Sequence, residues 1–550
     1  MTWIKDFLLI TLIIGTFFGA TLGSYPINAP DGARYSEIPR EMVVTHDYIT
    51  PHLNGVKYFE KPPLFYWMQA ISIKAFGATE LAVSIANALM ALGCALLVYF
   101  TGRKLYGRLS GMLASFIFAT CSIVFALTRV VTLDLALTFF LTGSLSMFLL
   151  ATQLPLGIRR NCYLWLMYVF AALAVMTKGL VGVIFPGLIV LVWTVIFNEW
   201  RSLKTYRIIS GLFVFMLIAM PWHILVQIKN PEFFHFYFID QHFLRYFTDY
   251  AGRSQPWWFF PAMLLGGLYP WVVFLPQTII YHVPKHFSQW QQYKPTLFLL
   301  IWAVVIYVFY TFSNSQLIPY VLPVFPPVAM LIGNYIATYW QSARERSITI
   351  GFSVLFFVNI ALGIAAIAAI FMLNFSEQTI TKQNLYIAAA YVIAGAVVSI
   401  ISYRRRGLVF GFAALALSVS VLWLYASPII TIVGKQAIKP LIITLQQKLK
   451  AEDEVICYGE YYQDLPFYLR RIVTVANYAG ELTFGMQHQD TKAWMIDPKI
   501  FWERWNSAKN VYLITSTNNY RALQATTTNK MRIVDKYLDD VLVVNTKEHL

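Results

Sequence analysis

The feature that most constrains the fold is a series of long apolar stretches running through the first 430 or so residues. A helix needs about 20 mostly apolar residues to cross the hydrocarbon core of a bilayer. Charged residues make up only 13% of the 550 residues, against about 25% in an average soluble protein. The pattern predicts a polytopic α-helical membrane protein and excludes a soluble, disordered or fibrous chain. Thirteen stretches are expected to span, at about 7–23, 81–102, 109–128, 133–151, 162–177, 180–197, 207–226, 257–279, 296–312, 318–339, 348–373, 385–402 and 407–427.

The net charge of +15 is explained by the loops between these stretches rather than by nucleic-acid binding. Basic residues gather in short cytoplasmic loops of membrane proteins. With a cytoplasmic N-terminus, every predicted inner loop is short and basic, and the odd number of spans places the C-terminus outside. The basic residues of these loops are Arg103, Lys104, Arg108, Arg159, Arg160, Arg201, Lys204, Arg207, Lys285, Lys294, Arg344, Arg346 and Arg404 to Arg406.

Three less apolar segments fall on the outer side. They are a first loop at about 24–80, a second loop at about 227–256 and a tail from about 428. We therefore expect a transmembrane domain at 1–427, which includes both loops, and a small periplasmic α/β domain at 428–550, because strand-like and helix-like runs alternate in the tail. The expected strands are 454–458, 472–475, 511–515, 531–536 and 541–545, and the helical runs are 461–470 and 498–508.

The first loop holds two amphipathic segments, at 31–44 and 63–75. One interpretation is that they lie flat at the membrane interface. The alternative is that they are loop helices packed on the rest of the protein, and the sequence does not separate the two.

Ionisable side chains gather at the outer edge of the bundle instead of running through its centre. Asp134 opens the fourth stretch and Lys178 closes the fifth, and the outer loops add further charges. Ion pumps and channels usually carry polar groups through the bilayer centre. A one-sided cluster fits an enzyme whose substrates rest at the membrane surface better than it fits a transporter.

The most informative pattern lies in the first loop, in APDGARYSEIPREM (29–42) and NGVKYFEKPPLFYW (54–67). Carboxylates at Asp31 and Glu60 stand beside cations at Arg34, Lys57 and Lys61. Cations neutralise phosphate, and an arginine can hold it through two hydrogen bonds, so the pattern suits a phosphorylated substrate. The alternatives are a helix N-cap for Asp31 and a solvated charged turn for Glu60 and Lys61.

These residues also carry a family resemblance. The sequence resembles the bacterial lipid A aminoarabinose transferases, which are C-type glycosyltransferases related to the protein O-mannosyltransferases. The resemblance spans nearly the whole chain, and its most specific part is the block Tyr58-Phe59-Glu60-Lys61-Pro62. The other matches are Asp31, Arg34–Tyr35, Thr132-Leu133-Asp134, Thr177-Lys178-Gly179, Pro221–Trp222, His242, Arg245, residues 317–323 (LIPYVLP) and residues 462–468 (YQDLPFY).

The resemblance implies a helix bundle with juxtamembrane helices and a C-terminal soluble domain. It implies transfer of 4-amino-4-deoxy-L-arabinose from undecaprenyl phosphate to a phosphate of lipid A, at the periplasmic face of the inner membrane. The added amine would offset negative charge and give resistance to cationic peptides such as polymyxin. Nucleic acid is not an expected partner.

The resemblance also implies roles for individual residues. Asp31, Glu60 and Lys61 are the expected catalytic group, with Asp31 as the carboxylate near the sugar. The expected substrate-binding residues are Arg34, Tyr58, Asp134, Lys178, Arg245 and Tyr320.

By the same resemblance, Glu60 and His242 are expected to share a metal such as zinc. Two ligands make an incomplete zinc site, so such an ion is expected to be structural and no cofactor to be essential. The alternative is that His242, in a Phe-rich loop, is simply a packed residue.

Gly32 departs from the family pattern, because many relatives carry a second acid directly after the aspartate. A mechanism that depends on two neighbouring carboxylates is therefore not expected here. Residues 461, 462, 464 and 470 of the tail are candidates for saccharide contact, but a structural role in the first helix of the domain is the favoured interpretation.

Two other functions compete with lipid A modification. A protein O-mannosyltransferase would use a polyprenyl-phosphate sugar and yield a glycopeptide. A lipid transporter or flippase would move its substrate across a bilayer without transfer chemistry.

Overall fold

The structure is a computed structural model that describes residues 2–249, 252–341, 345–372, 382–430, 437–478, 480–507, 509–527 and 531–545. The chain divides into two compact units. The membrane unit contains residues 1–22, 84–224 and 235–430, and the α/β unit contains residues 23–83, 225–234 and 431–550. Residues 373 and 508, which end two expected helices, lie outside the described residues.

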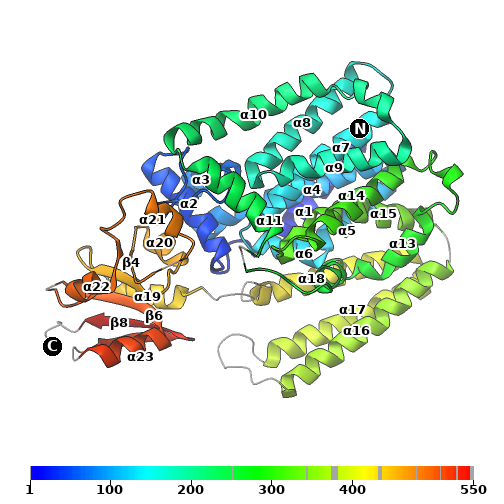
Figure 1. The fold of residues 1–550 in the computed structure, drawn as a ribbon. Coiled ribbons are helices and arrows are strands. Elements are labelled where there is room, and N and C mark those ends of the chain that lie inside the picture. The colour runs from blue at the N-terminus through cyan, green and yellow to red at the C-terminus, as the bar shows by residue number, and fades with distance from the viewer. Residues whose placement is uncertain are drawn as a thin grey trace. The chain divides into compact units, whose positions relative to one another are not determined.

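The membrane unit consists of helices (Figure 1). Its helices are α1 (Thr2–Gly19), α4 (Glu80–Tyr106), α5 (Arg108–Thr120), α6 (Ser122–Arg129), α7 (Asp134–Thr152), α8 (Ile158–Lys178), α9 (Val181–Phe197), α10 (Ile208–Lys229), α11 (Arg245–Phe247), α12 (Phe259–Gly267), α13 (Leu275–His282), α14 (Lys294–Thr311), α15 (Phe325–Thr338), α16 (Arg346–Met372), α17 (Lys382–Arg406) and α18 (Leu408–Ile430). The shorter turns are η1 (Trp200–Thr205), the π-helix η2 (His235–Leu244), η3 (Trp271–Phe274), η4 (Phe287–Gln289) and η5 (Ile318–Val324).

Within the described residues, ten helices are long and apolar enough to cross a membrane, and the number rises to twelve if two bent pairs count as one span each. A further apolar helix, Val181–Phe197, is shorter. Each of the thirteen expected spans thus has a helical counterpart, and the membrane-protein fold is confirmed. Two of these spans are bent, because α5 and α6 meet at 56° and α12 and the η3–α13 segment meet at 100°. Pro270 lies in the second break and lacks the N–H that a continuous helix needs there.

Burial differs sharply between helices of this unit. In α7, 89% of the most apolar 18-residue stretch is buried, as expected of a helix that is apolar on all sides and surrounded by other helices. In α16 and α17, which pack on each other (Figure 1), the corresponding values are 22% and 17%, so most of the surface of these two helices is not covered by other described parts of the chain.

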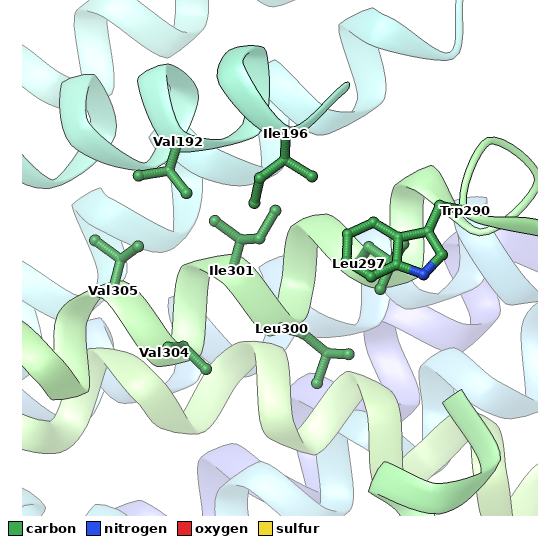
Figure 2. Close-up of a pocket in the computed structure, with 8 residues that line it drawn as sticks. All are labelled: Val192, Ile196, Trp290, Leu297, Leu300, Ile301, Val304 and Val305. Carbon is green, nitrogen blue, oxygen red and sulfur yellow. The ribbon is translucent and has the colours of Figure 1, made fainter. Parts of the chain in front are cut away.

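An apolar groove of about 220 Å³ runs between α9 and α14 (Figure 2). Its lining contains no titratable side chain, so it can contact hydrocarbon but supplies no acid–base or phosphate-binding group. The lining residues are Val192, Ile196, Trp290, Leu297, Leu300, Ile301, Val304 and Val305.

The α/β unit joins the first outer loop to the C-terminal tail. Its elements are α2 (Asp31–Thr45), β1 (His52–Leu53), β2 (Val56–Lys57), α3 (Leu64–Phe76), α19 (Lys439–Lys448), β3 (Glu454–Tyr458), α20 (Asp464–Leu469), β4 (Thr474–Ala476), α21 (Thr483–Gln487), β5 (Met495–Ile496), α22 (Pro498–Trp505), β6 (Val511–Ser516), α23 (Thr517–Thr526), β7 (Met531–Tyr537) and β8 (Asp540–Asn545).

Six of these strands form one sheet in the order β5-β4-β3-β6-β8-β7. The first four are parallel and β8 and β7 are antiparallel. Leu513 of β6 packs in a core with Phe501 of α22 and Tyr520 of α23, whereas the hydroxyl of its neighbour Tyr512 donates to the Lys448 carbonyl of α19 at 3.4 Å. Successive strand residues point to opposite faces, so helices cover both faces.

The expected α/β tail agrees with this sheet, and its five strands are found within about two residues. The two-residue strand β5 and the helices α19, α21 and α23 are additional. Local capping explains where two helices begin: the Asp497 side chain accepts the Ile500 N–H at 2.9 Å at the start of α22, and the Ser516 side chain accepts the Asn519 N–H at 3.3 Å at the start of α23.

The amphipathic segments of the first loop are the helices α2 and α3. Residues 32–42 of α2 are all buried, and α2 packs on α3, β1 and α20. Packing within the α/β unit therefore explains α2 better than exposure at a membrane surface.

Candidate active site

Asp31 and Arg34 lie one turn apart at the start of α2. The Arg34 Nη1 donates to Asp31 Oδ1 at 3.0 Å, with 7% of the arginine side chain and 41% of the aspartate side chain exposed. A second carboxylate, Glu481 from the C-terminal tail, forms an ion pair with Arg34 Nη2. A buried guanidinium is thus held between two carboxylates, as charge burial requires.

Two buried tyrosines face the same charges. Tyr58 follows β2 and Tyr66 lies in α3, and both side chains are at most 3% exposed. Arg34 lies 5.7 Å from the centre of the Tyr58 ring. Burial raises the pKa of both tyrosines well above the usual value, and the negative charges of Glu60 and Glu481 add to the effect. Both hydroxyls therefore remain protonated at neutral pH.

Several donors of this cluster have no hydrogen-bond partner within the described part of the chain. They are the Arg34 Nε and the hydroxyls of Tyr58 and Tyr66. Buried donors without partners cost free energy unless a ligand satisfies them. Their number and type fit oxygen atoms of a phosphate or a sugar.

Glu60 and Lys61 occupy the bend between β2 and α3, and both are half-buried. The charge of Glu60 acts on Arg34, Tyr58 and Tyr66. The structure therefore groups Glu60 with the Asp31–Arg34 pair, as the sequence pattern suggests.

Gly32 has a local reason to lack a side chain. A Cβ at this position would lie 2.1 Å from Asn28 Oδ1. A side chain at position 32 would therefore require the Asn28 side chain to move.

A second charged group lies in the membrane unit, where α7 begins and α8 ends. Lys178 forms an ion pair with Asp134 and lies 4.2 Å from the centre of the Tyr320 ring of η5. Both charged side chains are about nine-tenths buried. The Thr132 hydroxyl donates to Asp134 Oδ2 at 2.6 Å and fixes the carboxylate. Three of the expected substrate-binding residues thus make one cluster.

Arg245 is the first residue of α11, and its guanidinium makes two hydrogen bonds. Nη1 donates to Gln241 Oε1 at 2.8 Å and Nε contacts Ser315 Oγ at 3.4 Å. Residues 313–316 carry no lysine, and this loop meets Arg245 through the neutral hydroxyl of Ser315.

The donor set does not fit the expected metal shared by Glu60 and His242. The His242 Nδ1 pairs with the Tyr237 carbonyl at 2.5 Å, and Nε2 accepts the Leu180 N–H at 3.2 Å, so neither ring nitrogen is left to bind a metal. No group of three or more His, Cys, Asp and Glu side chains suited to a metal is found in the described residues. His242 instead fixes the chain reversal after α8, as the packed-residue interpretation proposes.

Sequence reasoning missed the part that the tail plays in this cluster. Glu481 is a single acidic residue in an otherwise ordinary stretch, and no motif marks it. Asp464 and Tyr462, the favoured structural residues of the tail, do serve the fold: Asp464 accepts the Ile438 N–H at 2.9 Å and Tyr462 donates to Asp540 at 2.6 Å.

Comparison with known proteins shows which families the chain is similar to. Residues 28–237 match the family described as dolichyl-phosphate-mannose-protein mannosyltransferase, and residues 441–545 match the aminoarabinose transferase C-terminal domain. The undecaprenyl phosphate-alpha-4-amino-4-deoxy-L-arabinose arabinosyl transferase 2 of Proteus mirabilis is 28% identical, with 90% of each chain covered. The corresponding transferase of Shewanella sediminis is 27% identical, with 88% of each chain covered.

Solved structures extend the likeness to the whole fold. The crystal structure of ArnT from Cupriavidus metallidurans bound to undecaprenyl phosphate matches with a TM-score of 0.86 and 26% identity, covering 99% of this chain and 98% of that one. The oligosaccharyltransferase of Archaeoglobus fulgidus shares only the fold, with a TM-score of 0.51, 13% identity and coverage of 94% and 70%. The chain therefore belongs to the aminoarabinose transferase family of membrane glycosyltransferases, which use polyprenyl-phosphate sugar donors.

Proposed function

We propose that this protein moves 4-amino-4-deoxy-L-arabinose from undecaprenyl phosphate to a phosphate of lipid A at the periplasmic face of the bacterial inner membrane. The observation that carries the proposal is the ion pair between Asp31 and the buried Arg34 guanidinium. Beside it lie the Arg34 Nε and the hydroxyls of Tyr58 and Tyr66, which have no hydrogen-bond partner among the described residues. The whole-chain likeness to aminoarabinose transferases selects the sugar and its carrier. The added amine would lower the negative charge of lipid A and so give resistance to polymyxin.

The transfer needs no net proton movement. An oxygen of the acceptor phosphate attacks the anomeric carbon, the bond from that carbon to the donor phosphate oxygen breaks, and undecaprenyl phosphate leaves with the electron pair. An ionised phosphate is already a nucleophile, so Asp31 would act by position and charge near the sugar rather than as an obligatory base.

The other groups of the α/β unit would manage phosphate charge. Arg34 and Lys61 would bind phosphate oxygens, and Tyr58 would donate a hydrogen bond to one of them. Glu60, whose charge acts on Arg34 and Tyr58, would keep these groups in place.

The membrane-unit groups would bind the donor. Lys178, held by Asp134 and the Tyr320 ring, is a buried cation suited to the donor phosphate. Tyr320 would donate a hydrogen bond, and Arg245 would add a second positive charge.

The proposed reaction is tested by mass spectrometry of lipid A from cells with and without the protein, both containing the donor lipid. Asp31→Asn and Glu60→Ala should each abolish the mass increment while the protein remains inserted and folded. Asp490→Asn, a change at an exposed carboxylate of the same unit, is the matched control and should leave the modification intact. Identical lipid A in cells with and without the protein would refute the proposed function.

Assays on the purified protein distinguish the competing functions. A glycopeptide product, with lipid A unchanged, would support the protein O-mannosyltransferase to which residues 28–237 are similar. Donor-lipid movement across proteoliposomes without transfer would support a flippase.

The periplasmic location can be tested with a membrane-impermeant maleimide. A cysteine introduced at the exposed position 490 should react in intact spheroplasts. The native Cys162 is exposed and lies beside a predicted inner loop, so it should react only after the membrane is opened. The reverse pattern would refute the proposed orientation.

A further inference from the structure

Arg34 is shared between two acids of different origin. Asp31 comes from the same helix turn and accepts from Nη1, whereas Glu481 comes from the C-terminal tail and pairs with Nη2. The Asp31 side chain is 41% exposed and the Glu481 side chain 13% exposed. The better buried partner of the arginine is therefore the one that sequence reasoning did not assign to the site.

Glu481 is held in place by its own domain. The Gln463 Nε2 donates to Glu481 Oε1 at 2.7 Å, and the Glu481 N–H donates to the Tyr478 hydroxyl at 3.0 Å. A carboxylate fixed at both its backbone and its side chain offers Arg34 a pre-positioned partner. Such an arrangement costs less side-chain entropy than a pair of mobile surface residues.

The division of charge around Arg34 affects Asp31. A guanidinium has two edges that can each bind a carboxylate through paired hydrogen bonds. Glu481 occupies Nη2 of the guanidinium, and Asp31 accepts from Nη1 through Oδ1. Without Glu481, the whole positive charge would act on Asp31 and would draw that carboxylate away from a sugar.

We propose that Glu481 of the C-terminal domain is a positioning residue for sugar transfer, which holds the Arg34 guanidinium so that Asp31 stays available to the donor sugar. This inference rests on the proposed function of Asp31 and Arg34. It gives the C-terminal domain a direct part in the reaction, beyond folding.

The test compares Glu481→Gln, Glu481→Ala and Glu481→Asp in the full-length enzyme with a donor-lipid transfer assay. We expect kcat to fall ~10- to 100-fold in the glutamine and alanine variants, with KM for the donor nearly unchanged, because a misplaced reacting group costs about this much. Glu481→Asp should recover part of the rate, since it keeps the charge.

Glu454→Gln is the matched control. Glu454 lies in the same domain and pairs with Arg504 at 2.6 Å with 21% of its side chain exposed. This variant removes a comparable ion pair away from the cluster, and it should keep the wild-type kcat.

The pH profile provides a readout that a purely structural role would not change. Burial raises the pKa of Glu481, and the charge of Arg34 only partly opposes this. As the pH falls, the wild-type carboxylate becomes neutral and kcat should approach that of Glu481→Gln, whose own profile should lack this decline. The titratable groups that act on Glu481 or are affected by it are Arg34, Asp31, Glu60, Tyr58, Tyr66, Tyr461 and Tyr478.

The tyrosines in this set do not titrate in the acidic range, because burial raises the pKa of each. Asp31→Asn removes the other carboxylate that pairs with Arg34, and this variant is inactive if the proposed function holds. Wild-type kcat in the Glu481→Gln and Glu481→Ala variants at every pH would overturn the inference and leave the proposed function standing. A loss of kcat that only follows a loss of folded protein would overturn it as well, whereas inactive wild-type enzyme would refute the function itself.

Discussion

Asn54 anchors the β1–β2 hairpin to the C-terminal domain, and its replacement tests how the α/β unit is assembled. Asn54 and Gly55 form the two-residue turn, with φ of +53° and +73°, as an Asn-Gly pair favours. The Asn54 side chain is buried, donates to the Val473 carbonyl at 3.0 Å and accepts the Val473 N–H at 2.9 Å. The hairpin leads directly into the Tyr58–Pro62 block.

The substitution Asn54→Gly removes both hydrogen bonds without adding backbone strain, because glycine adopts positive φ freely. Each bond contributes about 1 kcal/mol net, and the Val473 groups left without partners add to the loss. We expect the free energy of unfolding to fall by about 2–4 kcal/mol. For a domain of 150–250 residues this corresponds to a drop in melting temperature of about 5–15 °C.

The assay is thermal unfolding of the detergent-purified protein, combined with lipid A modification in cells. Asn198→Gly is the control, because Asn198 is an exposed asparagine with φ of +54° and its replacement should change stability by at most about 0.5 kcal/mol. Asn54→Asp should destabilise most at neutral pH, where the new carboxylate faces the Val473 carbonyl, and less in acid, where it can donate. Equal melting temperatures for the position 54 and position 198 glycine variants would refute this reasoning.

Three further predictions concern buried charge and close packing. Burial raises the pKa of Glu41 well above its usual value, so the folded state binds this proton more tightly than the unfolded state does and loses stability as the pH rises. The melting temperature of Glu41→Gln should therefore rise relative to that of the wild type as the buffer goes from acidic to neutral. A constant difference in melting temperature across this pH range would contradict the prediction. Gly179→Ala places a Cβ 2.2 Å from the Nε2 of His242 and should lower the free energy of unfolding by about 2–4 kcal/mol. Gly107→Ala lies at a similar positive φ with nothing within 4 Å and should lower it by about 1 kcal/mol. Equal losses for the two variants in calorimetry would show that the collision with His242 does not occur. Asp134→Asn leaves Lys178 buried without its ion-pair partner and should cost about 3–5 kcal/mol, and adding Lys178→Met should restore the melting temperature but not lipid A modification.

The local sequence was sufficient to predict the membrane helices and the succession of strands and helices along the tail. Apolar length is a property of neighbouring residues, so hydropathy located each helical segment. The alternation of strand and helix likewise predicted the α/β tail. Bends such as the one near Pro270 were not apparent, because the apolar pattern continues through them.

The sequence by itself also brought the candidate site residues into view, since the Tyr58–Pro62 block and its charges are contiguous in the chain. Only the tertiary structure decided their partners. Glu481 meets Arg34, and Asn54 meets Val473, across more than four hundred residues of chain. Periodicity and spacing describe a residue's near neighbours along one helix or strand, whereas these partners are selected by the packing of distant segments into one core.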